Sequence, residues 1–298
     1  MAAALLVQAA CSPAQTPQAA PSAGTSPQGC VWIVKSPSGG RLYLCGTIHI
    51  LRESDYPLAP AYEAAYADAQ KLVFELPPGA ATGGDMNASM QKLAALPDGT
   101  TLDSLVGAEM AGAVLKWAAQ HRLSPSAITG FQPWYVALMI AAVEYGSLGA
   151  QPDKGVDNYF EARAARDQKP GEGLETVEFQ IGLFSKLSAV QQKELLQQTL
   201  AEVKTMGADF EKLLKAWKEG DITVLHELLF REAEQFPDLM DLFLTSRNKA
   251  WLDRLDGFLK KGERVMVLVG AGHLTGKQGL IELLKAKGHA VEHFQGGK

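Results

Sequence analysis

The sequence predicts an α+β protein, a mixed α/β fold in which one central sheet is built from the two ends of the chain. Apolar strand patterns occur near the start, at 31–45 and 71–76, and again near the end, at 264–269 and 290–294. The stretch between them, about 100–254, has an almost entirely helical pattern. Strands at both ends with helices between them favour a single sheet with a large helical insertion packed over or beside it.

The composition is that of an ordinary globular protein. The 298 residues are 47% hydrophobic and 20% charged, and the formal net charge is −5. These values exclude a collagenous, coiled-coil or wholly disordered chain. The chain has no block of Lys and Arg, so we expect no nucleic-acid partner. No window reaches the roughly 18 apolar residues that a membrane-spanning helix needs, and three cysteines are too few for a disulfide framework.

Residues 1–28 differ from the rest of the chain. An apolar run, MAAALLVQAA, precedes Cys11, and the uncharged segment after it is rich in Pro, Ser, Thr and Gly, so we expect a disordered tether. The arrangement resembles a truncated bacterial lipoprotein signal in which Cys11 carries the lipid. A truncated ordinary signal and a plain disordered tail are the alternatives. We expect a place in the bacterial cell envelope, periplasmic or lipid-anchored, with membrane attachment only through Cys11.

The first two strands predict a hairpin. VWIVK (31–35) and RLYLC (41–45) are apolar runs joined by SPSGG, whose Pro and Gly are typical of a turn. If Val31 and Cys45 pair, Cys30 lies diagonal to Cys45. A Cys30–Cys45 disulfide is then conceivable in an oxidising compartment, and two separate buried thiols are the alternative.

The other elements follow from apolar periodicity. An Ala-rich helix opened by prolines is expected at 57–70, before the strand KLVFEL at 71–76. The end of the chain predicts a strand at 264–269 (RVMVLV), a helix at 277–287 and a strand at 290–294. Helical patterns in the middle cover 109–121, 133–145, 156–167, 189–205, 210–219 and 241–260.

One short motif, Gly-x-x-His, occurs twice, each time directly after an apolar strand. GTIH (46–49) follows RLYLC and GAGH (270–273) follows RVMVLV. Ligand sites in open α/β sheets lie at the carboxyl ends of strands. A single histidine after a strand is more often a structural hydrogen-bonding residue, but two presented in the same way favour a shared cleft for His49 and His273. Neutral imidazole is a common metal ligand and the usual general base near pH 7.

A third strand delivers Glu75, which lies among apolar residues in KLVFEL. A buried carboxylate needs a cation, a metal or hydrogen-bond donors; the alternative is a carboxylate on an edge strand that faces water. With His49 and His273, Glu75 completes a His/Glu/His set suited to Zn, Mn or Co. If the three strands are neighbours, these side chains should converge within roughly 8 Å, a span that one metal ion bridges at ligand distances of about 2 Å.

Four polar residues in the helical region are weaker candidates for the same site. Asp157 in GVD and Glu175 in GLET each precede a helical pattern, and each could be no more than a carboxylate at a helix start. Arg247 and Asn248 lie within a helix whose other face is apolar. We expect these four residues to support the site or to contact substrate.

The glycine-rich run GAGHLTGKQG (270–279) has a competing interpretation, because phosphate-binding loops also follow a strand and open a helix. Its spacing misses the P-loop pattern, with Ala271 in place of the first glycine and Gln278 in place of the Ser or Thr.

The other histidines lack a glycine context and are expected to be structural or at the surface: His121, His226, His289 and His293.

Together these segments resemble the TraB/PrgY/GumN family, in particular its GumN-like bacterial branch. The stretch 42–76 is similar to the opening of that family and 265–294 to its closing signature. Between them, three segments resemble the middle motifs in the expected order: GVDNYF (155–160), GLETVEFQ (173–180) and RNKAW (247–251). The resemblance covers 29–298, everything after the tether, as one domain.

The resemblance implies a relationship to the Tiki metalloproteases, which use two Gly-x-x-His motifs and a Glu with Mn or Co. It also implies a remote link to erythromycin-esterase-like hydrolases and haem-binding ChaN-like proteins. Residue by residue, it implies a central set of His49, Glu75 and His273. Glu175, Arg247 and Asn248 match family positions of less defined role.

Two hypotheses of function follow. The first is a metal-dependent hydrolase, in particular a peptidase, that acts on a peptide or small-molecule substrate with a divalent metal (Mn, Co or Zn). His49 and His273 would be metal ligands, or one a ligand and the other a base, and Glu75 would be a ligand or the general base. The sequence has no HExxH, which excludes a zincin mechanism. The second is a non-catalytic envelope protein that binds or sequesters a peptide, haem or a metal in the same cleft.

Overall fold

The structure, a computed structural model, describes residues 28–80, 84–230 and 236–296. Within these ranges six strands form one mixed sheet in the order β4-β3-β5-β2-β1-β6. With helices making up most of the rest, the α+β class predicted from the sequence is confirmed. The strands are β1 Val31–Lys35, β2 Arg41–Thr47, β3 Lys71–Phe74, β4 Gly171–Gly173, β5 Arg264–Gly270 and β6 Ala290–His293.

The two ends of the chain interleave in this sheet. β5 lies between β2 and β3 and runs parallel to both, with Thr47 of β2 opposite Gly270 of β5. β1 and β6 complete one edge through antiparallel pairings. β4 forms the other edge by pairing with β3. This strand departs from the helical pattern expected in the middle of the chain, because its sequence, Gly-Glu-Gly, carries no apolar strand signal.

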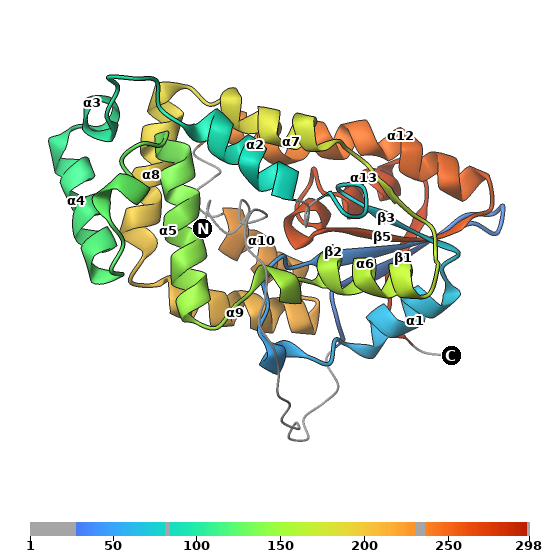
Figure 1. The fold of residues 1–298 in the computed structure, drawn as a ribbon. Helices are drawn as coiled ribbons and strands as arrows, with labels where there is room; N and C mark the ends of the chain where they lie inside the picture. The colour runs from blue at the N-terminus through green and yellow to red at the C-terminus, as the bar shows by residue number, and fades with distance from the viewer. Residues whose placement is uncertain (1–27, 81–83, 231–235, 297–298) are drawn as a thin grey trace.

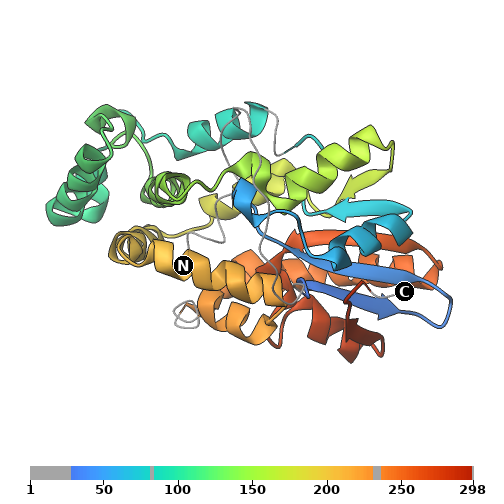
Figure 2. The same cartoon turned by 90° about the horizontal axis from the view of Figure 1, so that it is seen from below.

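Helices cover both faces of the sheet. α1 and α6 lie on one face, and α12 and α13 lie on the other (Figures 1 and 2). The helices are α1 Pro60–Asp68, α2 Gly84–Ala94, α3 Leu102–Val106, α4 Ala108–Gln120, α5 Pro133–Ser147, α6 Val156–Arg166, α7 Val177–Ser185, α8 Ala189–Glu202, α9 Met206–Glu219, α10 Ile222–Phe230, α11 Pro237–Met240, α12 Ser246–Lys260 and α13 Leu280–Ala286.

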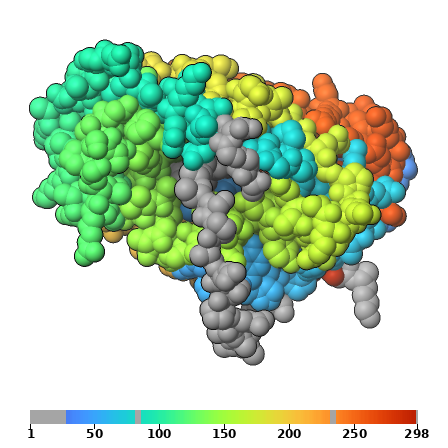
Figure 3. Space-filling view, in the orientation of Figure 1, coloured from blue at the N-terminus to red at the C-terminus, as the bar shows by residue number. Residues whose placement is uncertain are grey.

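Buried apolar side chains form two clusters. The larger surrounds the sheet and includes the inward sides of α1, α6, α9, α10, α12 and α13. The second lies among α2, α3, α4, α5, α7 and α8, and contains the buried Trp134 and Ile140. In the space-filling view, the green residues of α3 and α4 form the end of the molecule opposite to the orange α12 (Figure 3). The helical region therefore packs both over the sheet and beside it.

The N-terminal interpretation stays a prediction. Cys11 and the expected tether up to residue 27 lie outside the described residues. Of the helices that the structure describes, none is both long and apolar enough to cross a membrane.

Cys30 and Cys45 are free, buried thiols. Val31 pairs with Cys45 as expected, which places Cys30 diagonal to Cys45. Of the two arrangements considered from the sequence, the structure therefore contains the two separate thiols and not the disulfide. Burial raises the pKa of both thiols, so the reactive thiolate form is scarce at neutral pH.

We expect both thiols to resist modification in the native protein. In a Cys11→Ser variant, a maleimide reagent should leave the folded chain unmodified, since neither thiol is exposed or ionised. After unfolding in urea without a reductant, mass spectrometry should show that both Cys30 and Cys45 are modified. A Cys30–Cys45 disulfide would instead leave the unfolded chain unmodified until a reductant is added.

Candidate functional site

The three side chains predicted to share a site meet at the carboxyl ends of β2, β3 and β5. A Cβ atom built on Gly270 would lie 3.3 Å from His49 Nε2, 3.4 Å from Glu75 Oε1 and 3.8 Å from His273 Cδ2. The convergence expected from the sequence is therefore present. Because any larger residue at position 270 would intrude between these groups, glycine keeps the space among them open.

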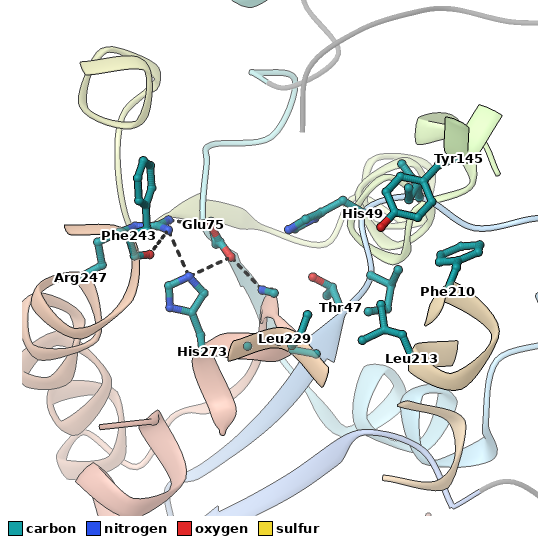
Figure 4. Close-up of a pocket in the computed structure, with 15 residues that line it drawn as sticks. Thr47, His49, Glu75, Tyr145, Phe210, Leu213, Leu229, Phe243, Arg247 and His273 are labelled. Carbon is teal, nitrogen blue, oxygen red and sulfur yellow. Dashed lines mark hydrogen bonds and ion pairs between the residues drawn. The ribbon is translucent and has the colours of Figure 1, made fainter. Parts of the chain in front are cut away.

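This cluster lines part of a pocket that is partly open to solvent (Figure 4). Much of the remaining lining is apolar and comes from helices whose sequence does not connect them with the site. These side chains had no distinguishing signal, because an apolar residue that lines a pocket has the same helical periodicity as one in the core. They are Tyr145, Phe210, Leu213, Leu229 and Phe243.

Asp157 orients His49. Asp157 Oδ2 lies 2.8 Å from His49 Nδ1, so we assign the proton to Nδ1, which leaves the Nε2 lone pair towards Gly270. The preceding Gly155 permits this approach, because a Cβ there would collide with the His49 carbonyl. The Val156 N–H then donates to the Ile48 carbonyl at 3.1 Å. Asp157 is therefore more than a carboxylate at a helix start.

The same carboxylate controls the protonation of His49. Burial lowers the pKa of His49, but the charge of Asp157, its hydrogen bond and the charge of Glu75 act in the opposite direction. These three effects together exceed the effect of burial, so the pKa of His49 lies above its ordinary value. His49 is accordingly the more basic of the two motif histidines.

Glu75 is buried and ionised. It is 4% exposed, which excludes the alternative of an edge carboxylate that faces water. Arg247 Nη2 donates to Glu75 Oε2 at 2.7 Å, and the Gly270 N–H donates to Oε1 at 2.7 Å. Burial alone would raise the pKa of Glu75, but the charge of Arg247 above all, helped by the Gly270 hydrogen bond, holds it well below its usual range.

Arg247 binds several groups of the site at once. Besides Glu75, it donates to Glu175 from Nε at 2.9 Å and from Nη2 at 2.8 Å. Its Nη1 donates to the Phe243 carbonyl at 3.0 Å and lies 3.1 Å from His273 Nε2. One buried guanidinium thus joins α12 to the ends of β3, β4 and β5.

The contacts of His273 determine its tautomer. Because a guanidinium only donates, His273 Nε2 accepts from Arg247 and the ring proton lies on Nδ1. That proton is donated to Asn248 Oδ1 at 2.6 Å, and Asn248 Nδ2 donates to the Gln278 carbonyl at 2.8 Å. Burial and the Arg247 charge outweigh Glu75 and lower the pKa of His273 to about 3. His273 is therefore neutral at physiological pH.

Glu175 connects two residues that sequence reasoning did not assign to the site. It accepts from Trp251 Nε1 at 3.0 Å and from Gln180 Nε2 at 3.0 Å. Gln180 also donates to Glu75 Oε2 at 3.2 Å. Both residues belong to the middle motifs quoted above, but a polar atom within a helical pattern does not reveal its partner.

The side chains of the cluster include the donors that a metal ion needs, but their present contacts occupy two of them. His49, Glu75 and His273 are the ligand types that Zn, Mn and Co bind. Nevertheless, no group of three His, Cys, Asp or Glu side chains in the described part of the chain is arranged as a metal site. Glu75 Oε2 and His273 Nε2 face the guanidinium of Arg247. This arrangement fits a divalent ion only if Arg247 turns away from them.

The phosphate-loop interpretation of 270–279 finds no support in this geometry. The Gly270 N–H is already bonded to the Glu75 carboxylate, and α13 begins only at Leu280.

The other four histidines have structural partners, and none of them lines the pocket. His121 pairs with Glu144, His226 with Thr275, His289 with Asp256 and His293 with the Gly29 carbonyl.

Fold and pocket define an α+β protein with a His/Glu/His cluster at the strand ends, supported by a buried Arg–Glu pair. The chain belongs to the TraB/PrgY/gumN family, whose model matches residues 30–293. The family membership inferred from the motifs is therefore confirmed.

Individual relatives are distant. The chain is 26% identical over 254 residues to the uncharacterized protein YbaP of Escherichia coli (strain K12), which covers 84% of this chain and 89% of YbaP. It is 24% identical over 196 residues to metalloprotease TIKI1 of Danio rerio, 56% of this chain and 39% of that protein. Metalloprotease TIKI2 of Xenopus tropicalis is 22% identical over 309 residues, 86% of this chain and 58% of the relative. No solved structure gives a significant match.

The role of Asp157 can be tested through pH dependence. Because the folded-state pKa of His49 is raised, protonated His49 contributes stability below about pH 6.5 that is lost as the pH rises through the folded-state pKa. In Asp157→Asn, an NMR titration should show a lower His49 pKa. The loss of Tm relative to wild type should also be larger near pH 5.5 than near pH 8.5. An unchanged His49 pKa would contradict the pairing.

The role of Arg247 can be tested through stability. Arg247→Gln should lower the free energy of unfolding by about 3–5 kcal/mol, because Glu75 and Glu175 would remain buried without their cation. Arg254→Gln is a matched control on the same helix, with a half-exposed side chain that pairs with Glu172, and should cost no more than about 1 kcal/mol. Urea denaturation measures both; equal effects would contradict a special role for Arg247.

Proposed function

We propose that this chain is a hydrolase that cleaves peptide bonds in the pocket at the strand ends. The observation that carries the proposal is the position of His49 Nε2 and Glu75 Oε1, 3.3 and 3.4 Å from a Cβ built on Gly270. A base and a carboxylate at one point of a partly apolar pocket suit the hydrolysis of a carbonyl bond. The relatives named metalloproteases support a peptide as the substrate class.

His49 is the general base in this proposal. A water molecule attacks the peptide carbonyl carbon and gives one proton to His49 Nε2. Asp157 stabilises the resulting imidazolium through Nδ1, and Glu75 adds a second negative charge nearby. His49 then gives the proton to the leaving amine as the C–N bond breaks. Glu75 is a poor base because its pKa is lowered, and His273 is a poor base because its pKa is about 3.

The apolar lining supports a preference among peptides. Tyr145, Phe210 and Leu213 line the same pocket as His49 and lie on the His49 side of it in Figure 4, away from Arg247. Burial of an apolar side chain against them contributes roughly 25 cal/mol per Å² of area removed from water. We therefore expect cleavage next to apolar residues.

A divalent metal, Mn, Co or Zn, is part of the proposal. Glu75 and His273 would hold it once Arg247 turns towards Glu175 alone, to which it already donates from two nitrogen atoms; His49 would then remain the base. When bound, the ion would polarise the scissile carbonyl as a Lewis acid. The relatives TIKI1 and TIKI2 are both named metalloproteases, which supports a metal as part of the proposal.

The test is the digestion of a mixed peptide library, read by mass spectrometry, with and without Mn²⁺, Co²⁺ or Zn²⁺. We expect cleavage that falls by more than about 100-fold in His49→Ala, with an unchanged far-UV CD spectrum. His121→Ala is the control, because it removes a histidine that pairs with Glu144 away from the pocket; it should retain wild-type turnover.

Two outcomes would contradict the proposal. Stoichiometric binding of a peptide, haem or a metal without turnover would favour the sequestering protein over the hydrolase. Cleavage that persists in both His49→Ala and His273→Ala would show that the reaction takes place elsewhere.

A further inference from the structure

The hydroxyl of Thr47 is a buried polar group that nothing in the fold accounts for. Thr47 ends β2 and is the second residue of the first Gly-x-x-His motif. It is 1% exposed, and within the described residues its Oγ1 has no hydrogen-bond partner. A buried hydroxyl without a partner costs about 1–3 kcal/mol, and valine would fill the same volume of the strand without that cost.

The other buried threonines of the described chain differ in this respect. Thr199 is equally buried, and its Oγ1 donates to the Leu195 carbonyl at 2.8 Å. Thr275 Oγ1 donates to the Gly272 carbonyl at 3.2 Å. Thr47 is thus the buried threonine whose hydroxyl has no structural use, and it is the one that lines the pocket.

The sheet register directs Thr47 towards the reacting groups. Thr47 pairs with Gly270 across β2 and β5, and residues opposite each other in neighbouring strands point to the same face of the sheet. A side chain at Gly270 would lie among His49 Nε2, Glu75 Oε1 and His273. The Thr47 side chain therefore lies beside this open space, and in Figure 4 its hydroxyl points between His49 and the Glu75–His273 pair.

We propose that the Thr47 hydroxyl binds the attacking water and is a catalytic residue; this inference rests on the proposed hydrolase function. One O–H of the water donates to His49 Nε2 and the other donates to Thr47 Oγ1. A lone pair of the water is then free to form the bond to the carbonyl carbon. The transferred proton passes through His49 to the leaving nitrogen as the C–N bond breaks, and Thr47 gains and loses no proton.

The experiment compares Thr47→Val, Thr47→Ser and Thr199→Val in the full chain, with the best-cleaved peptide of the library as the probe. We expect Thr47→Val to lower kcat by about 100-fold with little change in KM, because the hydroxyl holds the water and not the peptide. Thr47→Ser retains the hydroxyl and should restore most of the turnover. Thr199→Val should leave turnover unchanged, because Thr199 lies outside the pocket lining.

Stability separates this role from a structural one. Thr47→Val should have a Tm equal to or above that of wild type, because it removes a buried hydroxyl that has no partner. A lower Tm that Thr47→Ser restores would show that the hydroxyl supports the fold, and would overturn the inference. Wild-type turnover in Thr47→Val would also overturn it while leaving the hydrolase proposal intact. If the wild type cleaves no peptide, both proposals fail together.

Discussion

The buried ion pair between Glu75 and Arg247 is the constraint on which the rest of the site depends. The two residues lie 172 positions apart in the chain. Because an ionised carboxylate in an apolar interior needs a cation, a metal or hydrogen-bond donors, and Arg247 supplies the cation here, the pair holds α12 against the end of β3. The same guanidinium donates to Glu175 after β4 and to His273 after β5. The helical region between the two halves of the sheet is therefore fixed to the ends of its strands.

This pair also gives the two motif histidines different chemistry. Both follow parallel strands after a Gly-x-x sequence, yet burial, with the charge of Arg247, lowers the pKa of His273 to about 3 and keeps it neutral, while Asp157 raises the pKa of His49. The motif determines where each imidazole lies, and burial together with the charged or polar groups around each ring determines its protonation. A repeated motif with unequal neighbours can thus supply a base and a neutral group to one pocket.

The sequence allowed the fold class and the central cluster to be predicted for a physical reason. Apolar strand patterns identify the strands that carry His49, Glu75 and His273, and parallel strands bring their carboxyl ends to one edge.

The partner of Glu75 was not predictable, because the charge of Arg247 within a helical pattern does not reveal what it faces. Phe210 and Leu213 look like core residues in the sequence, and β4 has no strand signal. Cys11, the tether and the envelope location stay predictions.

The most direct measurement of the central constraint is a double-mutant cycle between Glu75 and Arg247. The free energy of unfolding would be measured in urea for Glu75→Gln, Arg247→Gln and the double variant. If the two side chains pair in the folded protein, the double variant should lose at least about 1 kcal/mol less than the two single losses combined, since each single variant leaves its partner buried and unpaired. Losses that add within about 0.5 kcal/mol would contradict it, because they would show that the two side chains do not interact in the folded protein.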